Sequence, residues 1–245
     1  MANKTAKFIG VLIALALAAA AAWYLLRPAP PAPPPPPPPP AQQAPAKTAD
    51  VPLPPPAESD AQVRGALAAV SPRKELQKWL QEHDLLDRWT VVADNLAEGV
   101  SPRKQLAFLA PEKKFLAAGR EGNELIDPRS YQRYDLFAEV VSSVDAQALA
   151  AAVRALHPLL EATYHKLGYP DRKLDEVAQK ALQRLLDAPV VEGPLQIVPK
   201  GAVYKFAVPE LEALGPIEKH LLRMGPRNTR LIQAKARELS ATLQH

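Results

Sequence analysis

The stretch DAQALAAAVRALHPLLEATYHKLGYPDRKLDEVAQKALQRLL, residues 145–186, determines the fold class of this chain. Asp145 is a residue type that caps helix N-termini, and the alanine- and leucine-rich run after it predicts a long helix. Pro158 is expected to kink or divide that helix. After the stop signal Gly-Tyr-Pro at 168–170, Leu174–Leu186 has the apolar spacing of a second, amphipathic helix. Two such helices in succession favour a mainly α domain.

Shorter helices are predicted before this stretch. Ser59 and Asp60 are candidate caps for a helix over residues 61–70, and Ser71-Pro72 combines a cap with a proline at the first helical position. Asp84 is expected to open a further helix, which ends at Gly99. All of these belong to a domain predicted over residues 60–245.

A minor β component is expected within the same domain. Residues 114–127 read as a small hairpin that turns at Glu121-Gly122-Asn123, after which Asp127-Pro128 opens another helix. Residues 190–206 contain two prolines and predict short extended pieces. The final two helices are expected to begin at Gly215-Pro216 and Gly225-Pro226. The predicted fold is therefore a compact multi-helix domain with a small β-hairpin.

A membrane anchor is predicted near the N-terminus. Phe8–Leu26 is a run of 19 residues without a charged side chain, preceded by Lys4 and Lys7. As a helix it spans about 28 Å, close to the ~30 Å hydrocarbon core of a bilayer. The charge order predicts a cytoplasmic segment 1–7 and a translocated remainder. The alternative is a cleaved signal peptide, since Ala18–Ala22 offers small residues, but the apolar run is longer than a typical signal core.

A disordered proline-rich linker is predicted over residues 27–59. It has 16 prolines between Pro28 and Pro56, and Pro33–Pro40 is an unbroken run of eight. Proline donates no backbone hydrogen bond, so helix and sheet are both disfavoured there and an extended polyproline helix is expected. The linker is interpreted as a spacer; the alternative is a docking site for a proline-recognising groove.

The composition excludes several classes of function. The chain has no cysteine, which excludes disulfides and cysteine-ligated metals or redox centres. Its formal net charge of +4 is too small to indicate a nucleic-acid partner. No nucleophile elbow, P-loop, zinc-protease motif or dinucleotide fingerprint is present, and no cofactor is expected.

Four segments give the chain a resemblance to a known family. They are VADNLAEG at 92–99, DPRSYQRYD at 127–135, HPLLEATYHKLGYPDR at 157–172 and VYKFAVPELEALGPIEKHLLRMGPRN at 203–228. From about Asp60 onwards the chain resembles the bacterial domain of unknown function 3014. The resemblance implies a membrane-anchored envelope protein, and it supplies no activity and no binding residues.

One weak metal site is considered on the longest predicted helix. His157, Glu161 and His165 follow one another at intervals of four residues, which keeps them near one helix face. Pro158 disturbs that geometry and no fourth ligand is apparent. The preferred interpretation is two partly exposed histidines beside a solvated glutamate, with no metal.

Basic residues supply the candidate anion sites. The string Val-Ser-Pro-Arg-Lys occurs at 70–74 and again at 100–104, and it places Arg73, Lys74, Arg103 and Lys104 at predicted helix starts. Cations there, together with free amide groups, can hold a phosphate or lipid headgroup. Arg227 and Arg230 on the last helix form a second basic candidate. In both cases the simpler interpretation is a set of solvated charges.

The function expected from these observations is that of a single-pass protein of the bacterial inner membrane with a periplasmic domain. The domain is interpreted as a non-enzymatic module that binds an envelope protein or the cell wall. An anion- or lipid-headgroup-binding domain, and an envelope hydrolase with an unrecognised site, are the alternatives.

Overall fold

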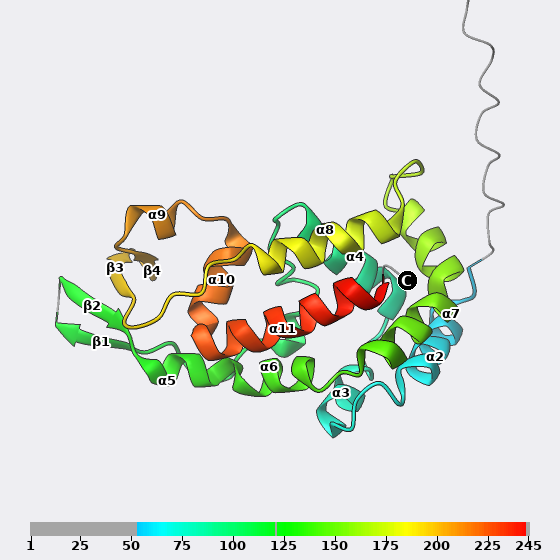
Figure 1. Ribbon diagram of the computed structural model, residues 1–245, viewed down its shortest axis with the longest axis horizontal. Coiled ribbons are helices and arrows are strands. Elements are labelled where there is room, and N and C mark those ends of the chain that lie inside the picture. Colours follow the sequence, from blue (N-terminus) through cyan, green and yellow to red (C-terminus); the bar gives the residue numbers. More distant parts are fainter. Residues whose placement is uncertain (1–52, 121, 244–245) are drawn as a thin grey trace, which may run out of the picture. The chain divides into compact units, whose positions relative to one another are not determined.

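The computed structural model describes residues 53–120 and 122–243, and Figure 1 shows their arrangement. The predicted anchor at Phe8–Leu26 and most of the predicted linker lie outside the described residues. Within the described residues, no single helix is long and apolar enough to cross a membrane. One bent pair, Pro128–Ser142 with Ala146–His165, has the required length and composition only when both helices are taken together.

The first described helix, α2 (Pro56–Leu67), begins earlier than the sequence predicts. Pro56 occupies its first position, where proline sacrifices no helical hydrogen bond. Asp60 therefore lies inside α2 and does not cap it. Its carboxylate instead accepts the backbone N–H groups of Asp84 and Leu85 at 3.0 and 2.7 Å. The predicted cap at Asp60 is thus wrong for α2, and this carboxylate caps α4 across the interface.

The two copies of Val-Ser-Pro-Arg-Lys fold differently. After the first copy, α3 (Lys74–Trp79) starts two residues later than the Ser-Pro prediction, and the Ser71 hydroxyl accepts the backbone N–H of Arg73 at 3.2 Å. The second copy follows α4 (Leu85–Ala97) and leads only to turns and the short 3₁₀ helix η1 (Ala107–Leu109). The predicted helix start at the second copy is therefore wrong.

A four-stranded antiparallel sheet replaces the single predicted hairpin. The strands β1 (Ala117–Arg120) and β2 (Asn123–Ile126) form the expected hairpin. The segment predicted only as extended pieces forms a second hairpin from β3 (Gln196–Lys200) and β4 (Val203–Phe206), and β3 pairs with β2. The buried face of the sheet packs on the helix α10 through Leu222.

The central part of the chain is helical, as predicted. The helices α5 (Pro128–Tyr131), η2 (Gln132–Tyr134) and α6 (Asp135–Ser142) follow one another, and Asp127 caps the first. Asp145 caps α7 (Ala146–His165) by accepting the Ala148 N–H at 2.8 Å. Pro158 does not divide α7. Both Pro158 and Arg154, whose carbonyl loses its partner, are exposed, so water can satisfy that carbonyl.

The C-terminal helices complete the domain. The helix α8 (Leu174–Leu186) has the predicted bounds, and a short helix α9 (Pro209–Glu212) follows the sheet. The helices α10 (Pro216–Met224) and α11 (Pro226–Leu243) begin at the predicted prolines. The last helix, α11, packs against α6, α7, α8 and α10 with one face, and its other face is exposed at Arg227, Arg230, Ala234 and Arg237.

Candidate functional site

An apolar pocket lies where α6, α8, α10 and α11 meet beneath the segment 101–111. Its volume is about 270 Å³. The walls are mostly aliphatic and aromatic, and they include Leu106, Leu109, Phe137, Val141, Leu185 and Ile232. Ligand pockets in proteins combine such walls with a small number of placed polar groups. We therefore treat this pocket as the candidate functional site.

One wall of the pocket comes from a single face of α10. Ile217, His220, Leu221 and Met224 are spaced three, four and seven positions from the first, so they share that face. The opposite side of α10 presents Leu222 to the sheet. The helix therefore separates the pocket from the sheet and fixes the position of His220.

The segment 101–111 covers the pocket and is held by a few long-range contacts. The Arg88 side chain on α4 donates to the carbonyl of Gln105 at 2.5 Å, and its guanidinium lies 5.5 Å from the centre of the Phe108 ring. Farther along, Ser130 bonds both backbone groups of Leu116 through its hydroxyl, at 2.7 and 2.8 Å. Most of the segment between these points is irregular. The covering is therefore fastened to α4 at its middle, and three internal backbone hydrogen bonds at 2.9–3.1 Å, given by Leu106, Leu109 and Ala110, hold its turns.

His220 is uncharged at neutral pH. Burial lowers the pKa of its imidazole to about 4, and the positive charges of Arg103, Arg223 and Arg133 oppose its protonation further. Its ring meets the Tyr134 ring edge-on, with centroids 5.5 Å apart. A neutral imidazole both donates and accepts a hydrogen bond, so His220 is a polar group that an apolar pocket tolerates.

Three guanidinium groups lie near His220, and one of them, that of Arg103, lines the pocket. Arg103 lines the pocket from the covering segment, and Arg133 lies 5.2 Å from the centre of the Tyr134 ring. Arg223 lies one turn after His220 and 4.7 Å from the centre of the Phe206 ring. Within the part of the chain that the structure describes, none of these three arginines forms an ion pair with a carboxylate. Glu212 attracts Arg223 from beyond ion-pair distance, so the excess of positive charge here rests mainly on Arg103 and Arg133.

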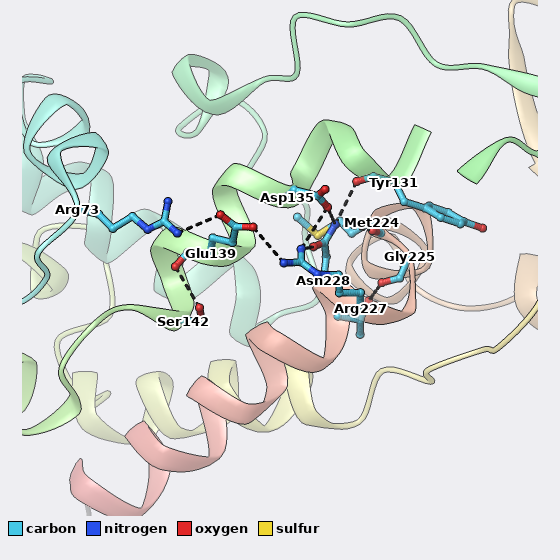
Figure 2. A network of polar contacts seen from close by, with 10 residues as sticks. Arg73, Tyr131, Asp135, Glu139, Ser142, Met224, Gly225, Arg227 and Asn228 are labelled. Atoms are coloured by element: carbon cyan, nitrogen blue, oxygen red, sulfur yellow. Dashed lines mark hydrogen bonds and ion pairs between the residues drawn. The ribbon is translucent and has the colours of Figure 1, made fainter. Parts of the chain in front are cut away.

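Two other predicted anion-binding residues are neutralised by a carboxylate. Arg73 and Arg227 reach Glu139 on α6 from opposite sides, each at 3.0 Å (Figure 2). The hydrogen bond from Arg227 and then that from Arg73 hold the pKa of the Glu139 carboxyl below its usual range. Arg227 also lies 3.5 Å from Asp135. These two arginines tie α3 and α11 to α6.

Asn228 organises the junction between α10 and α11 beside this network. It is 1% exposed, and its amide nitrogen donates to the carbonyls of Tyr131 and Met224 and to the Asp135 carboxylate, at 2.9–3.0 Å (Figure 2). Gly225, three residues before Asn228, has φ +82° and ψ 163°, and its carbonyl accepts a hydrogen bond from the Thr229 hydroxyl at 2.9 Å. Since Met224 lines the pocket, this junction fixes one end of the site.

The remaining candidates are dispersed. The His165 ring lies 3.3 Å from Glu161, whereas His157 lies 3.2 Å from Asp175. Residues 53–120 and 122–243 contain no group of three potential ligands close enough to hold a metal ion. Arg230 pairs with Glu192. Lys74 and Lys104 do not line the pocket, so of the six basic candidates only Arg103 does.

The sequence interpretation missed His220, Arg133 and Arg223, although one signal was available. Between Ala97 and β1 lie 19 residues, 98–116, without a periodic apolar pattern. Connections longer than about 12–15 residues are uncommon in compact domains and are often functional. The length of the connection 98–116 therefore indicates a functional segment, and this segment is the one that covers the pocket.

The fold and the site define a class: a mainly helical domain with a small antiparallel sheet and an internal apolar pocket. More particularly, the chain belongs to the family described as "Protein of unknown function (DUF3014)", whose sequence profile matches residues 85–240. The match runs from α4 into α11 and includes every residue that lines the pocket. No curated protein and no solved structure matches the chain.

Proposed function

We propose that this chain is a single-pass envelope protein whose domain binds a largely apolar ligand and does not catalyse a reaction. Phe8–Leu26 anchors it in the inner membrane, and the proline-rich linker places the domain in the periplasm. The observation that carries the proposal is the apolar pocket beneath residues 101–111. A folded domain gains stability by filling such a space with its own side chains, so an open one of this size favours a ligand.

The pocket also discriminates between the alternatives. Cell-wall glycans are rich in hydroxyl groups, which need polar partners that walls of leucine, isoleucine and phenylalanine do not supply. A hydrolytic site needs a base oriented by a second group. Within the described residues, His220 makes no side-chain hydrogen bond to a carboxylate or hydroxyl. The walls of the pocket therefore favour an apolar ligand over a cell-wall glycan or a hydrolytic substrate, and they add an apolar half to the headgroup-binding alternative drawn from the sequence.

The proposal is tested with the fragment Asp50–His245, the compact unit that holds the described elements. Its cooperative unfolding is checked first. N-phenyl-1-naphthylamine, an uncharged apolar dye, is then titrated into it, and saturable fluorescence at one dye per chain is expected. Leu106→Trp fills the pocket from its covering segment and should abolish that binding.

The matched control is Leu136→Trp, the same change at an α6 position that is 50% exposed and outside the pocket. This variant should bind the dye like the unaltered fragment. No saturable binding by the unaltered fragment, or equal binding by both variants, would overturn the proposal.

A further inference from the structure

We infer that the ligand of this pocket is a single acyl chain that carries one anionic head group, with the head held at Arg103 on the His220 side. This inference rests on the proposed function and specifies the chemistry of its ligand. The apolar pocket indicates the acyl chain, and the guanidinium groups near His220 indicate the anionic head group.

The size of the pocket matches one short alkyl chain. Its volume of about 270 Å³ corresponds to about nine water molecules at ~30 Å³ each, which leaves room for roughly ten non-hydrogen atoms. A diacyl lipid is too large to enter as a whole. A chain of about ten carbons fills the pocket and leaves its head group at the mouth.

The charges select an anionic head. Arg133 and Arg223 use their other donors on backbone carbonyls, those of Ser130 and Lys113 and those of Lys219 and Tyr204. These bonds fix both guanidinium groups. Glu212 attracts Arg223 from beyond ion-pair distance, whereas Arg133 forms no ion pair among the described residues. Arg103 is exposed and belongs to the covering segment, so its side chain is free to turn toward a bound head group.

The polar groups near the pocket have different roles in binding the head group. Arg103 provides the charge-assisted hydrogen bonds, for which a carboxylate or phosphate is the geometric match. Arg133 and Arg223 add an attractive field from fixed positions. His220 offers one further uncharged donor at the boundary between head and chain. An alcohol or another neutral amphiphile satisfies the apolar walls and leaves the charge of Arg103 without a partner.

The test uses the full chain in phosphatidylcholine nanodiscs and a decanoate analogue with a diazirine in its alkyl chain. After illumination, mass spectrometry is expected to find the label on pocket residues such as Leu109 and Val141. Unlabelled decanoate should compete, and the half-maximal concentration should fall about fourfold per methylene from six carbons up to about ten and then level off. Decyl phosphate run in parallel distinguishes a phosphate-bearing head from a carboxylate.

Arg103→Gln is the decisive variant, and Lys104→Gln is its control because it removes the same charge from the adjacent exposed residue outside the pocket. Arg103→Gln should weaken competition by decanoate about tenfold and leave competition by decanol unchanged. Lys104→Gln should change neither. High salt should weaken decanoate and spare decanol.

Two outcomes separate this inference from the proposed function. If decanol competes as well as decanoate and Arg103→Gln has no effect, the anionic head is refuted while apolar binding stands. If neither compound protects pocket residues from the label, the acyl-chain inference and the proposed function fail together.

Discussion

Gly225 allows a strong prediction because two independent constraints require glycine there. Its backbone, at φ +82° and ψ 163°, lies in a region that is essentially restricted to glycine. A Cβ atom at this position would lie 2.5 Å from Cγ of Tyr131 and 2.9 Å from two further atoms of that side chain. Gly225→Ala therefore combines backbone strain with overpacking.

Each of the two constraints contributes its own cost in unfolding free energy. The backbone conformation costs about 1–3 kcal/mol for a residue with a side chain. The overlap with Tyr131 costs about another 1–3 kcal/mol. The expected loss is about 4 kcal/mol of unfolding free energy, which lowers the urea midpoint by about 2 M at a slope of ~2 kcal/mol per M. Urea unfolding of Asp50–His245, followed by Trp79 and Trp89 fluorescence, measures it.

Gly65→Ala is the matched control. Gly65 lies in α2, its φ is not positive, and a Cβ there meets nothing within 4 Å. The same substitution should therefore stabilise the fragment by about 0.5–1 kcal/mol. The double variant Gly225→Ala/Tyr131→Ala removes the overlap with the Tyr131 ring. Compared with Tyr131→Ala alone, it should lose only the unfolding free energy that the strained backbone costs. A loss below about 1 kcal/mol for Gly225→Ala alone would refute both the backbone and the contact argument.

Three further variants test other parts of the domain. Asp60→Ala should lower the unfolding free energy by about 3 kcal/mol, because two N–H groups at the start of α4 lose a buried carboxylate. Its control, Ser59→Ala, should cost about 1 kcal/mol. Equal urea midpoints for the two variants would contradict the cap. Glu139→Gln should lower the midpoint at pH 7, and the difference from the unaltered chain should shrink as the pH falls below 4.5, because a carboxyl with a depressed pKa stabilises the fold only while it is ionised. For His220, with a pKa of about 4 in the fold and 6.5 unfolded, the unfolded chain binds an extra proton between those values. Stability should therefore fall by on the order of 3 kcal/mol as the pH drops from 6.5 to 4, and a calorimetric pH series on His220→Gln should lack that loss.

Helix boundaries set by local chemistry were predictable from the sequence. Asp145 caps α7 with an acceptor three residues from its partner, and Pro216 and Pro226 each start a helix directly after a glycine. These signals act within one turn, so no tertiary contact is needed to interpret them. The same holds for the hairpin turn between β1 and β2.

Features that depend on distant partners were not predictable. Asp60 is a residue type that caps the helix beginning next to it, yet the N–H groups that it caps lie 24 and 25 residues away. Arg73 and Arg227 look free in the sequence because Glu139, which neutralises both, is 66 and 88 residues distant. Arg103 and Lys104 are adjacent and chemically similar, and only packing decides that the first lines the pocket. A candidate site made of charges is therefore hard to judge from spacing alone.

The packing of α11 on four other helices has a consequence for how the protein is made. Among the described helices, α11 is synthesised last, and the faces of α6, α7 and α8 that pack on it have no partner until Pro226–Leu243 has left the ribosome. A nascent chain without that segment has no complete core and cannot close into its final shape. For a chain threaded through a secretion channel as proposed, this order of synthesis keeps the core of the domain incomplete until α11 has been made.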